Sequence, residues 1–405
     1  MVKLENLIHD EKFFQLEYIK EQQKQYKFTQ AVKVETFLWD LEIYGQLQKV
    51  LGDKVILKGG AAAQLFVPPE RQRTSVDIDV IFVGKLKELE NALNLIHRDF
   101  GNDEVFFNFQ KFTPKNQKTT LPLETYTVAV PTISSSQRPI IIKVDFHLFD
   151  GLDLETVRLG DASAFVIPLN FKPLCLSPAS LVGDKLLTLA RGSVGIPSDR
   201  EYDIPKQLYD LDNLTRIIPE NGIGFIMKAE QALFERELSD RGMKATLKEA
   251  RGQMIDLLER YCWLDSPKGE ATARKVIKDF KGNYEPGPFK SVIQWAALAR
   301  RLQFLVKCLR QEIESNPLVH LARADALERA VGSGFNSQVA RTAILKNLRG
   351  EFVRMMEADR DTLKRLKNAP LERILWEIVT PTNLDDVEAI VSKRIENNQR
   401  KPYDS

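Results

Sequence analysis

Two aspartates two positions apart, Asp77 and Asp79, are the residues of this sequence best suited to chemistry. They lie in the apolar run Val76–Val83, whose alternation predicts a β-strand. Residues two apart on a strand share one face, so the carboxylates are held side by side. Like charges that close repel each other unless a cation lies between them, and hard oxygen ligands suit Mg²⁺ or Mn²⁺. The pair therefore predicts a divalent-metal site of the kind that serves nucleotidyl transfer.

Two consecutive glycines, Gly59 and Gly60, precede this strand and are followed by a short predicted helix, Ala61–Phe66. Glycine lets the backbone approach a ligand closely, and the first N–H groups of a helix bind phosphate. The glycine pair therefore predicts a turn that contacts phosphate groups.

A second polar strand face supplies a third acid. The run Ile140–Leu148 alternates so that Lys143, Asp145 and His147 share one face. If this strand pairs near the strand of the aspartate pair, three acids can hold two metal ions between an attacking hydroxyl and a triphosphate. An isolated acid pair is more often a solvated strand face. The glycines and the third acid favour phosphoryl transfer instead.

Later segments carry two lysines with alternative roles. Ser177 and Pro178 predict the start of a helix in which Lys185 lies among leucines. There Lys185 either extends to the surface or contacts triphosphate oxygens. Lys206 and Asp210 are four apart on a predicted helix, so a surface ion pair explains them as simply as catalysis does.

The elements that must position these residues form an α/β (α+β) fold in three parts. Residues 1–50 predict helices that pack on the core, and residues 51–200 a nucleotidyltransferase-type domain with a small mixed sheet. Residues 201–405 predict a mainly helical C-terminal domain. Within the middle part, the strands are expected at 80–83, 105–109, 126–130 and 140–148, and a helix is expected at 85–97.

The composition sets wide limits. The chain has 405 residues and a formal net charge of +2, which removes any general argument for nucleic-acid binding but leaves local patches open. No apolar run reaches about 18 residues, and the charged first residues do not resemble a signal peptide. We therefore expect a cytoplasmic protein without a membrane partner. The three cysteines, Cys175, Cys262 and Cys308, are too widely spaced to suggest a zinc site or a disulfide framework.

A basic segment rich in aromatic residues, 268–310, has two interpretations. Its lysines and arginines are interleaved with Phe280, Tyr284, Phe289, Trp295 and Phe304. Such a mixture binds RNA through phosphate contacts and base stacking. Alternatively, it is an amphipathic helical segment whose aromatics are core residues, and this alternative is favoured.

Four motifs together resemble a known family. In chain order they are Gly59-Gly60, Arg73-x-Ser75-x-Asp77-Ile78-Asp79, Asp184-Lys185-Leu186 and Lys206-x-x-Tyr209-Asp210-Leu211. Their order and spacing are similar to those of the AbiEii/AbiGii-type nucleotidyltransferase toxins, of the DNA polymerase beta-like nucleotidyltransferase superfamily. The resemblance covers Leu57 to Leu214.

The resemblance implies a function and a partner set. Members of this family are toxins of toxin–antitoxin systems that block growth or phage propagation, and some add nucleotides to the 3′ end of tRNA. It thus implies a nucleoside triphosphate donor, an RNA acceptor, Mg²⁺ or Mn²⁺, and a cognate antitoxin.

The resemblance also implies roles for individual residues. Asp77 and Asp79 hold the metal, Lys185 contacts the triphosphate, and Asp210 is the late catalytic acid. Asp145 joins the metal ligands and catalytic acids through the strand argument above. The matched motifs further suggest substrate contacts from Gly59, Gly60, Arg73, Ser75 and Lys206.

This chain departs from the family pattern at several positions. Ala61 and Ala62 follow the glycines, where the family usually has a hydroxyl, and Ile204 and Gln207 replace an arginine and an aspartate of the late motif. These departures leave open a non-catalytic nucleotide-binding module of the same fold. Nucleotidylation of a protein side chain is a second alternative.

Overall fold

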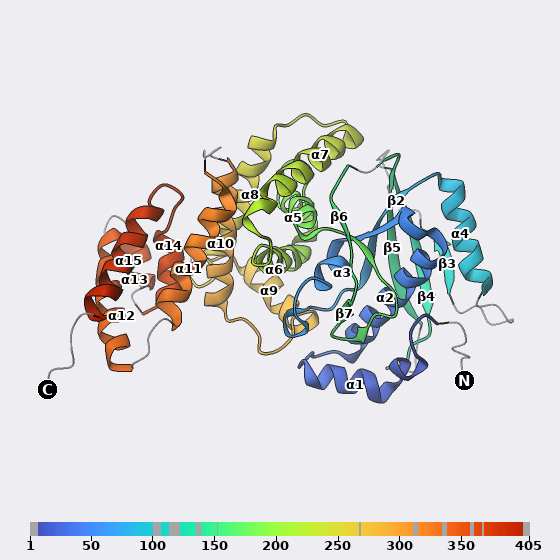
Figure 1. Cartoon of the computed structure of the whole chain (residues 1–405), viewed down its shortest axis with the longest axis horizontal. Coiled ribbons are helices and arrows are strands. Elements are labelled where there is room, and N and C mark those ends of the chain that lie inside the picture. Colours follow the sequence, from blue (N-terminus) through green and yellow to red (C-terminus); the bar gives the residue numbers. More distant parts are fainter. Residues whose placement is uncertain are drawn as a thin grey trace.

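The computed structural model describes residues 7–99, 107–112, 122–134, 139–151, 153–266, 269–310, 315–333, 338–356, 360–366 and 368–399. Along its longest axis the chain passes from a sheet with flanking helices to a purely helical part, and the last described helix lies at the end far from the sheet (Figure 1). The active-site residues predicted from the sequence belong to the sheet half and to the first helices that follow it.

A seven-stranded mixed sheet forms the centre of the N-terminal half. Its strand order is β3-β4-β5-β2-β1-β9-β6, and a separate ribbon pairs β7 with β8. β5 runs parallel to β2, and β9 runs parallel to β1, whereas the other pairings are antiparallel. The strands are β1 (Val55–Lys58), β2 (Asp77–Val83), β3 (Asn108–Lys111), β4 (Leu123–Val130), β5 (Ile140–Phe149), β6 (Thr156–Arg158), β7 (Ser163–Ala164), β8 (Ile167–Pro168) and β9 (Leu174–Leu176).

Alternation along β2 and β5 determines which side chains are buried. Ile78 and Val80 of β2 and Val144 and Phe146 of β5 are fully buried. The intervening polar residues therefore share the opposite face, as the period of two requires. This confirms the predicted polar face of β5.

The helix α2 (Ala31–Leu51) is buried along most of its length, and every residue from Val34 to Leu47 is buried. Its acids therefore need partners. Glu35 accepts hydrogen bonds from the backbone N–H groups of Ile133 and Ser134, at 2.6 and 2.8 Å. α2 thus belongs to the core of the sheet half, together with α1 (Leu16–Gln25), α3 (Gly59–Gln64) and α4 (Leu86–Asp99).

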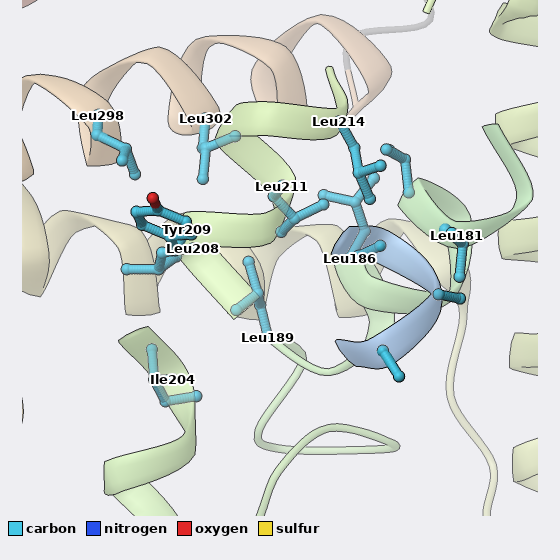
Figure 2. Close-up of a cluster of buried hydrophobic side chains, with 14 of the residues drawn as sticks. Leu181, Leu186, Leu189, Ile204, Leu208, Tyr209, Leu211, Leu214, Leu298 and Leu302 are labelled. Carbon is cyan, nitrogen blue, oxygen red and sulfur yellow. The ribbon is translucent and has the colours of Figure 1, made fainter. Parts of the chain in front are cut away.

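An apolar cluster of α5 (Pro178–Leu187), α6 (Ile204–Leu214) and α10 (Val292–Arg310) joins the two halves. Figure 2 shows Leu186 of α5 facing Leu211 of α6, while Leu298 and Leu302 of α10 lie on the other side of α6. Ser177 caps α5 by accepting a hydrogen bond from the Ser180 N–H at 3.1 Å. This confirms the predicted start of that helix.

Beyond α6 the described chain is helical. The remaining helices are α7 (Ile223–Arg241), α8 (Leu247–Cys262), α9 (Ala271–Asn283), α11 (Pro317–Ser333), α12 (Gln338–Met355), α13 (Arg360–Leu366), α14 (Leu371–Ile378) and α15 (Leu384–Gln399). Short 3₁₀ turns lie at Glu11–Phe14, Gly52–Lys54, Pro69–Arg71, Ser198–Asp203 and Glu220–Gly222. None of the helices, in the residues described, is long and apolar enough to cross a membrane.

The basic segment with interleaved aromatics divides between core and surface. Phe280, Trp295 and Phe304 are buried, as the amphipathic-helix interpretation predicts, whereas Phe289 is exposed and Tyr284 is half-buried.

The proposed division of the chain at residues 50 and 200 stays a prediction. The three cysteines are buried free thiols.

Candidate active site

The aspartate pair and Asp145 lie on adjacent parallel strands. In the β2–β5 register Asp79 is opposite Asp145, and Asp77 is opposite Lys143. The pairing on which the third acid depends is therefore present. Asp145 is held in place from both sides, because one carboxylate oxygen accepts a hydrogen bond from the Thr125 hydroxyl at 2.6 Å and the other contacts Lys143.

The glycine pair packs directly against these acids. Gly59 has φ +69°, and a Cβ at this position would collide with the carboxylate of Asp79. Only glycine tolerates both the backbone angle and the close approach. A Cβ at Gly60 would lie 2.8 Å from an Arg73 nitrogen and 3.1 Å from the Ser75 hydroxyl. The Ser75 hydroxyl thus lies beside the glycine turn. Ala61 and Ala62 follow this turn, where the family usually has a hydroxyl.

The charges around Asp79 favour the binding of a cation. Burial and, next, the negative charge of Asp145 raise the pKa of Asp79 to about 6. Lys58, opposite Asp79 in the β1–β2 register, forms an ion pair with Asp184 at 3.0 Å. Burial alone would lower the pKa of Lys58, but the charges of Asp184 and Asp79 hold it above its usual value.

A cavity of about 310 Å³ opens beside this cluster. Lys58, Gly59, Asp79 and Lys185 line it on the charged side, and apolar residues such as Leu123 line it elsewhere. Cavities of this size hold small-molecule ligands. The cavity brings the glycine turn, Asp79 of the aspartate pair and two lysines to a single space.

Asp210 is the centre of a buried ion-pair network beneath the cavity. It accepts two hydrogen bonds from the Arg73 guanidinium, at 2.8 and 2.7 Å, and one from Lys185 at 2.7 Å. Gln64 donates a further hydrogen bond to it at 3.0 Å. Burial alone would raise the pKa of Asp210, but Arg73 and Lys185 hold it below its usual value. Arg73 and Asp210 are thus paired with each other, and their expected contacts with substrate stay predictions.

For Lys185 and for Lys206, the structure excludes one of the two alternative roles. Lys185 is 2 % exposed, so it does not extend to the surface. Lys206 pairs with Asp203 at 3.1 Å rather than with Asp210, so the predicted Lys206–Asp210 surface ion pair is wrong. Asp210 is buried and already bonded to Arg73 and Lys185, which removes it from the helix surface. Gln207, the replacement in the late motif, accepts a hydrogen bond from Lys185 at 3.2 Å.

Two titratable residues near the site were not among the predicted site residues. His147 lines the cavity, and burial, reinforced by Lys58 and Arg236, holds its pKa well below the usual value. Asp40 of α2 is 1 % exposed, and neither of its carboxylate oxygens has a hydrogen-bond partner among the described residues. Burial, followed by the charges of Asp77 and Asp79, raises the pKa of Asp40 well above its usual value. An acid inside the apolar run Phe37–Leu41 was the sequence signal for it.

The donor set fits a divalent metal ion. Within the described residues, no group of three His, Cys, Asp or Glu side chains is already gathered at metal-binding distance. The fit therefore rests on chemistry. Asp79 and Asp145 are hard oxygen donors in register. Burial and, next, the charge of Asp145 raise the pKa of Asp79, and a bound cation would offset both effects.

Paired strand carboxylates beside a glycine turn and a lysine-lined cavity are the arrangement of a nucleotidyltransferase. The model of the AbiEii family, nucleotidyl transferase toxins of type IV toxin–antitoxin systems, matches residues 45–292. The chain belongs to this family, and it is a nucleotidyltransferase. No curated protein matches the sequence.

Two solved structures are similar to this chain. The nucleotidyltransferase toxin MenT4 from Mycobacterium tuberculosis H37Rv is 12% identical over 72% of this chain and 92% of its own, with a TM-score of 0.43. JHP933 from Helicobacter pylori is 13% identical over 68% of this chain and 93% of its own, with a TM-score of 0.37. The family assignment rests on the family match.

Proposed function

We propose that this chain transfers a nucleoside monophosphate from a nucleoside triphosphate to an acceptor hydroxyl on RNA, with pyrophosphate as the leaving group. The observation that carries the proposal is the placement of Asp79 opposite Asp145, against the Gly59 turn and at the edge of the cavity that Lys185 lines. Phosphoryl transfer depends mainly on positioning and charge neutralisation, which this set of groups supplies.

Asp77, Asp79 and Asp145 would hold Mg²⁺ or Mn²⁺. When bound, the ion would neutralise charge that develops on the triphosphate. The chain's own groups do the remaining work. Lys185 and Lys58 provide positive charge in the cavity, and the glycine turn at Gly59 and Gly60 lines the same cavity.

Asp145 is proposed as the base. The acceptor hydroxyl loses its proton to this carboxylate while its oxygen attacks the α-phosphorus. The bond from the α-phosphorus to the bridging oxygen breaks, and that oxygen leaves with pyrophosphate. Thr125 and Lys143 hold the Asp145 carboxylate in one orientation for this step.

Asp210 is proposed to position rather than to react. Its carboxylate holds the Lys185 ammonium at 2.7 Å, and Arg73 and Gln64 hold the carboxylate in turn. The amide of Gln207 adds a second contact to Lys185. The late-motif replacement is therefore compatible with a correctly placed lysine and with turnover.

The biological setting follows from the family. We propose that the chain is the toxin of a toxin–antitoxin or phage-defence pair, acts in the cytoplasm on the 3′ end of tRNA, and is restrained by a cognate antitoxin. The description of the family as toxins of type IV systems supports this setting.

The test is incubation of the purified chain with each common nucleoside triphosphate radiolabelled at the α-phosphate, Mg²⁺ or Mn²⁺, and total RNA with cell lysate. We expect label on a discrete RNA, and none with Asp77→Asn/Asp79→Asn. Label on a protein would replace the RNA acceptor with a protein one. Triphosphate binding without any labelled product would favour a non-catalytic module.

A further inference from the structure

A second group of positive charges lies beside the carboxylates but outside the cavity. Lys33 of α2 and Lys206 of α6 both lie over the ring of Tyr284, with their Nζ atoms 5.2 and 4.5 Å from the ring centroid. Tyr284 directly follows α9. We call these three residues the lysine–tyrosine cluster. None of them lines the cavity that contains Lys58 and Lys185.

Hydrogen bonds fix the cluster to the segment that leads into β2. The backbone N–H of Thr74 donates to the Tyr284 carbonyl at 3.2 Å. The Gln30 amide donates to Asn283 Oδ1 at 2.8 Å, which ties the start of α2 to the end of α9. Segments more than two hundred residues apart in sequence are thereby held together next to Asp77.

The Tyr284 ring is supported by a second aromatic ring and is partly accessible to solvent. Phe280, which is 2 % exposed, stacks on it with ring centroids 5.9 Å apart and an interplanar angle of 24°. Tyr284 itself is only half-buried. A ring held this way costs little conformational entropy to use as a stacking surface.

The cluster and the cavity lie toward different carboxylates of the pair. Asp79 lines the cavity. On the other side, burial alone would lower the pKa of Lys206, but Tyr284, Asp203 and Asp77 together hold it above the usual value. Asp77 lies three residues after Thr74, whose N–H donates to the Tyr284 carbonyl, so it is the carboxylate of the pair on the side of the cluster. A donor in the cavity and an acceptor at the cluster would meet at the acids between them.

Resting on the proposed function, we propose that the lysine–tyrosine cluster binds the end of the acceptor strand as single-stranded RNA. Lys33 and Lys206 leave the ring to contact its phosphates, and a terminal base takes their place on Tyr284. Aromatic rings flanked by cations bind single-stranded nucleic acid in this way. A protein hydroxyl acceptor has neither the phosphates nor the base that this arrangement would recognise.

The experiment measures the affinity of a short fluorescent single-stranded RNA for full-length chain carrying Asp79→Asn, which blocks turnover. Adding Tyr284→Ala should weaken binding by about tenfold to a hundredfold, and Tyr284→Phe should restore it because the ring is kept. Adding Lys33→Ala should reduce the slope of log affinity against log salt by about 0.7. Lys54→Ala is the matched control, since it removes a lysine at the opposite end of β2, where Lys54 pairs with Glu88.

Kinetics of the active chain separates the two proposals. Tyr284→Ala should raise KM for the RNA and leave KM for the nucleoside triphosphate unchanged. If wild type labels and binds RNA but Tyr284→Ala and Lys33→Ala match Lys54→Ala, the cluster is not the acceptor site and the proposed function stands. If wild type neither binds nor labels RNA, both proposals fail. Thermal unfolding of each variant shows whether a loss of affinity reflects a loss of fold.

Discussion

Gly59, at the start of α3, packs directly against the carboxylate of Asp79. The positive φ of Gly59 alone makes alanine unfavourable there, and the Asp79 carboxylate lies where its Cβ would be. The carboxylate and the glycine turn are thus positioned by one contact. At the scale of single residues, the site therefore requires glycine at position 59 as well as the acidic side chains.

Gly59→Ala should abolish nucleotide transfer and cost more than the about 1–2 kcal/mol of backbone strain alone, because it also adds a collision with Asp79. Gly52→Ala is the matched control, since Gly52 has φ +59° but no atom within 4 Å of its Cβ position. We expect the control to lose only the stability that backbone strain costs, measured by urea unfolding, and to keep its activity. Equal activities in the two variants would contradict the role of the Gly59–Asp79 contact.

Asp40 should make stability depend on pH. It faces Asp77 and Asp79, with Lys33 as the opposing positive charge, and its pKa is raised in the folded state. The folded chain therefore binds more protons than the unfolded chain, so the free energy of unfolding falls as pH rises above the usual carboxyl range. Asp40→Asn should remove a slope of up to about 1.4 kcal/mol per pH unit.

Urea unfolding of wild type and Asp40→Asn across pH 4 to 8 measures this difference. The two proteins should differ least at the acidic end, where Asp40 is neutral in the folded chain and still partly protonated in the unfolded chain, and the variant should be the more stable at the alkaline end. Parallel curves would show that Asp40 does not titrate abnormally.

At the scale of elements, Asp210 joins four segments. Its carboxylate connects α6 to Gln64 of α3, to Arg73 in the loop before β2 and to Lys185 of α5. Removing one partner of a buried network leaves the others charged and unpaired. The network therefore links the integrity of the fold to the position of Lys185.

Asp210→Asn should lower the free energy of unfolding by about 3–5 kcal/mol, because Arg73 and Lys185 lose their shared counter-charge. Glu88→Gln is the control, since it breaks the exposed Lys54 ion pair and should cost about 0–1 kcal/mol. Chemical denaturation measures both. A loss for Asp210→Asn no larger than the control's would contradict the network.

At the scale of the whole molecule, α6 is shared between the sheet half and the C-terminal helices. Arg301 of α10 is fully buried and binds Asp325 of α11 at 2.6 and 2.7 Å. It also donates to Asp212 of α6 at 3.2 Å. The apolar side chains drawn in Figure 2 also pack between α6 and α10. We therefore propose that the helical domain supports the site through α6.

Arg301→Met should destabilise the chain by about 3–5 kcal/mol, since Asp212 and Asp325 lose their buried counter-charge. Arg323→Met, in the same helical part, breaks exposed pairs with Asp385 and Glu388 and should cost about 0–1 kcal/mol. Differential scanning calorimetry would compare them. Equal midpoints would indicate that α6 and α10 do not depend on this arginine.

Several features of the site could be predicted from the sequence because they are local. The alternation of β2 and β5 placed Asp77, Asp79 and Asp145 on polar faces, and Ser177 with Pro178 marked the start of α5. The helix α9 and the strand β9 were not predicted individually. Both are held by contacts with segments that are distant in the sequence, and short-range periodicity does not reveal such contacts.

The sequence by itself determined the secondary-structure pattern around the acids and the family to which the chain belongs. Tertiary structure alone decided that Arg73 pairs with Asp210, 137 positions away, and that Lys185 is buried against the same carboxylate. It also decided that Lys33 and Tyr284 meet beside Asp77. Backbone period is a property of neighbouring residues, whereas burial and charge pairing depend on which distant segments pack together.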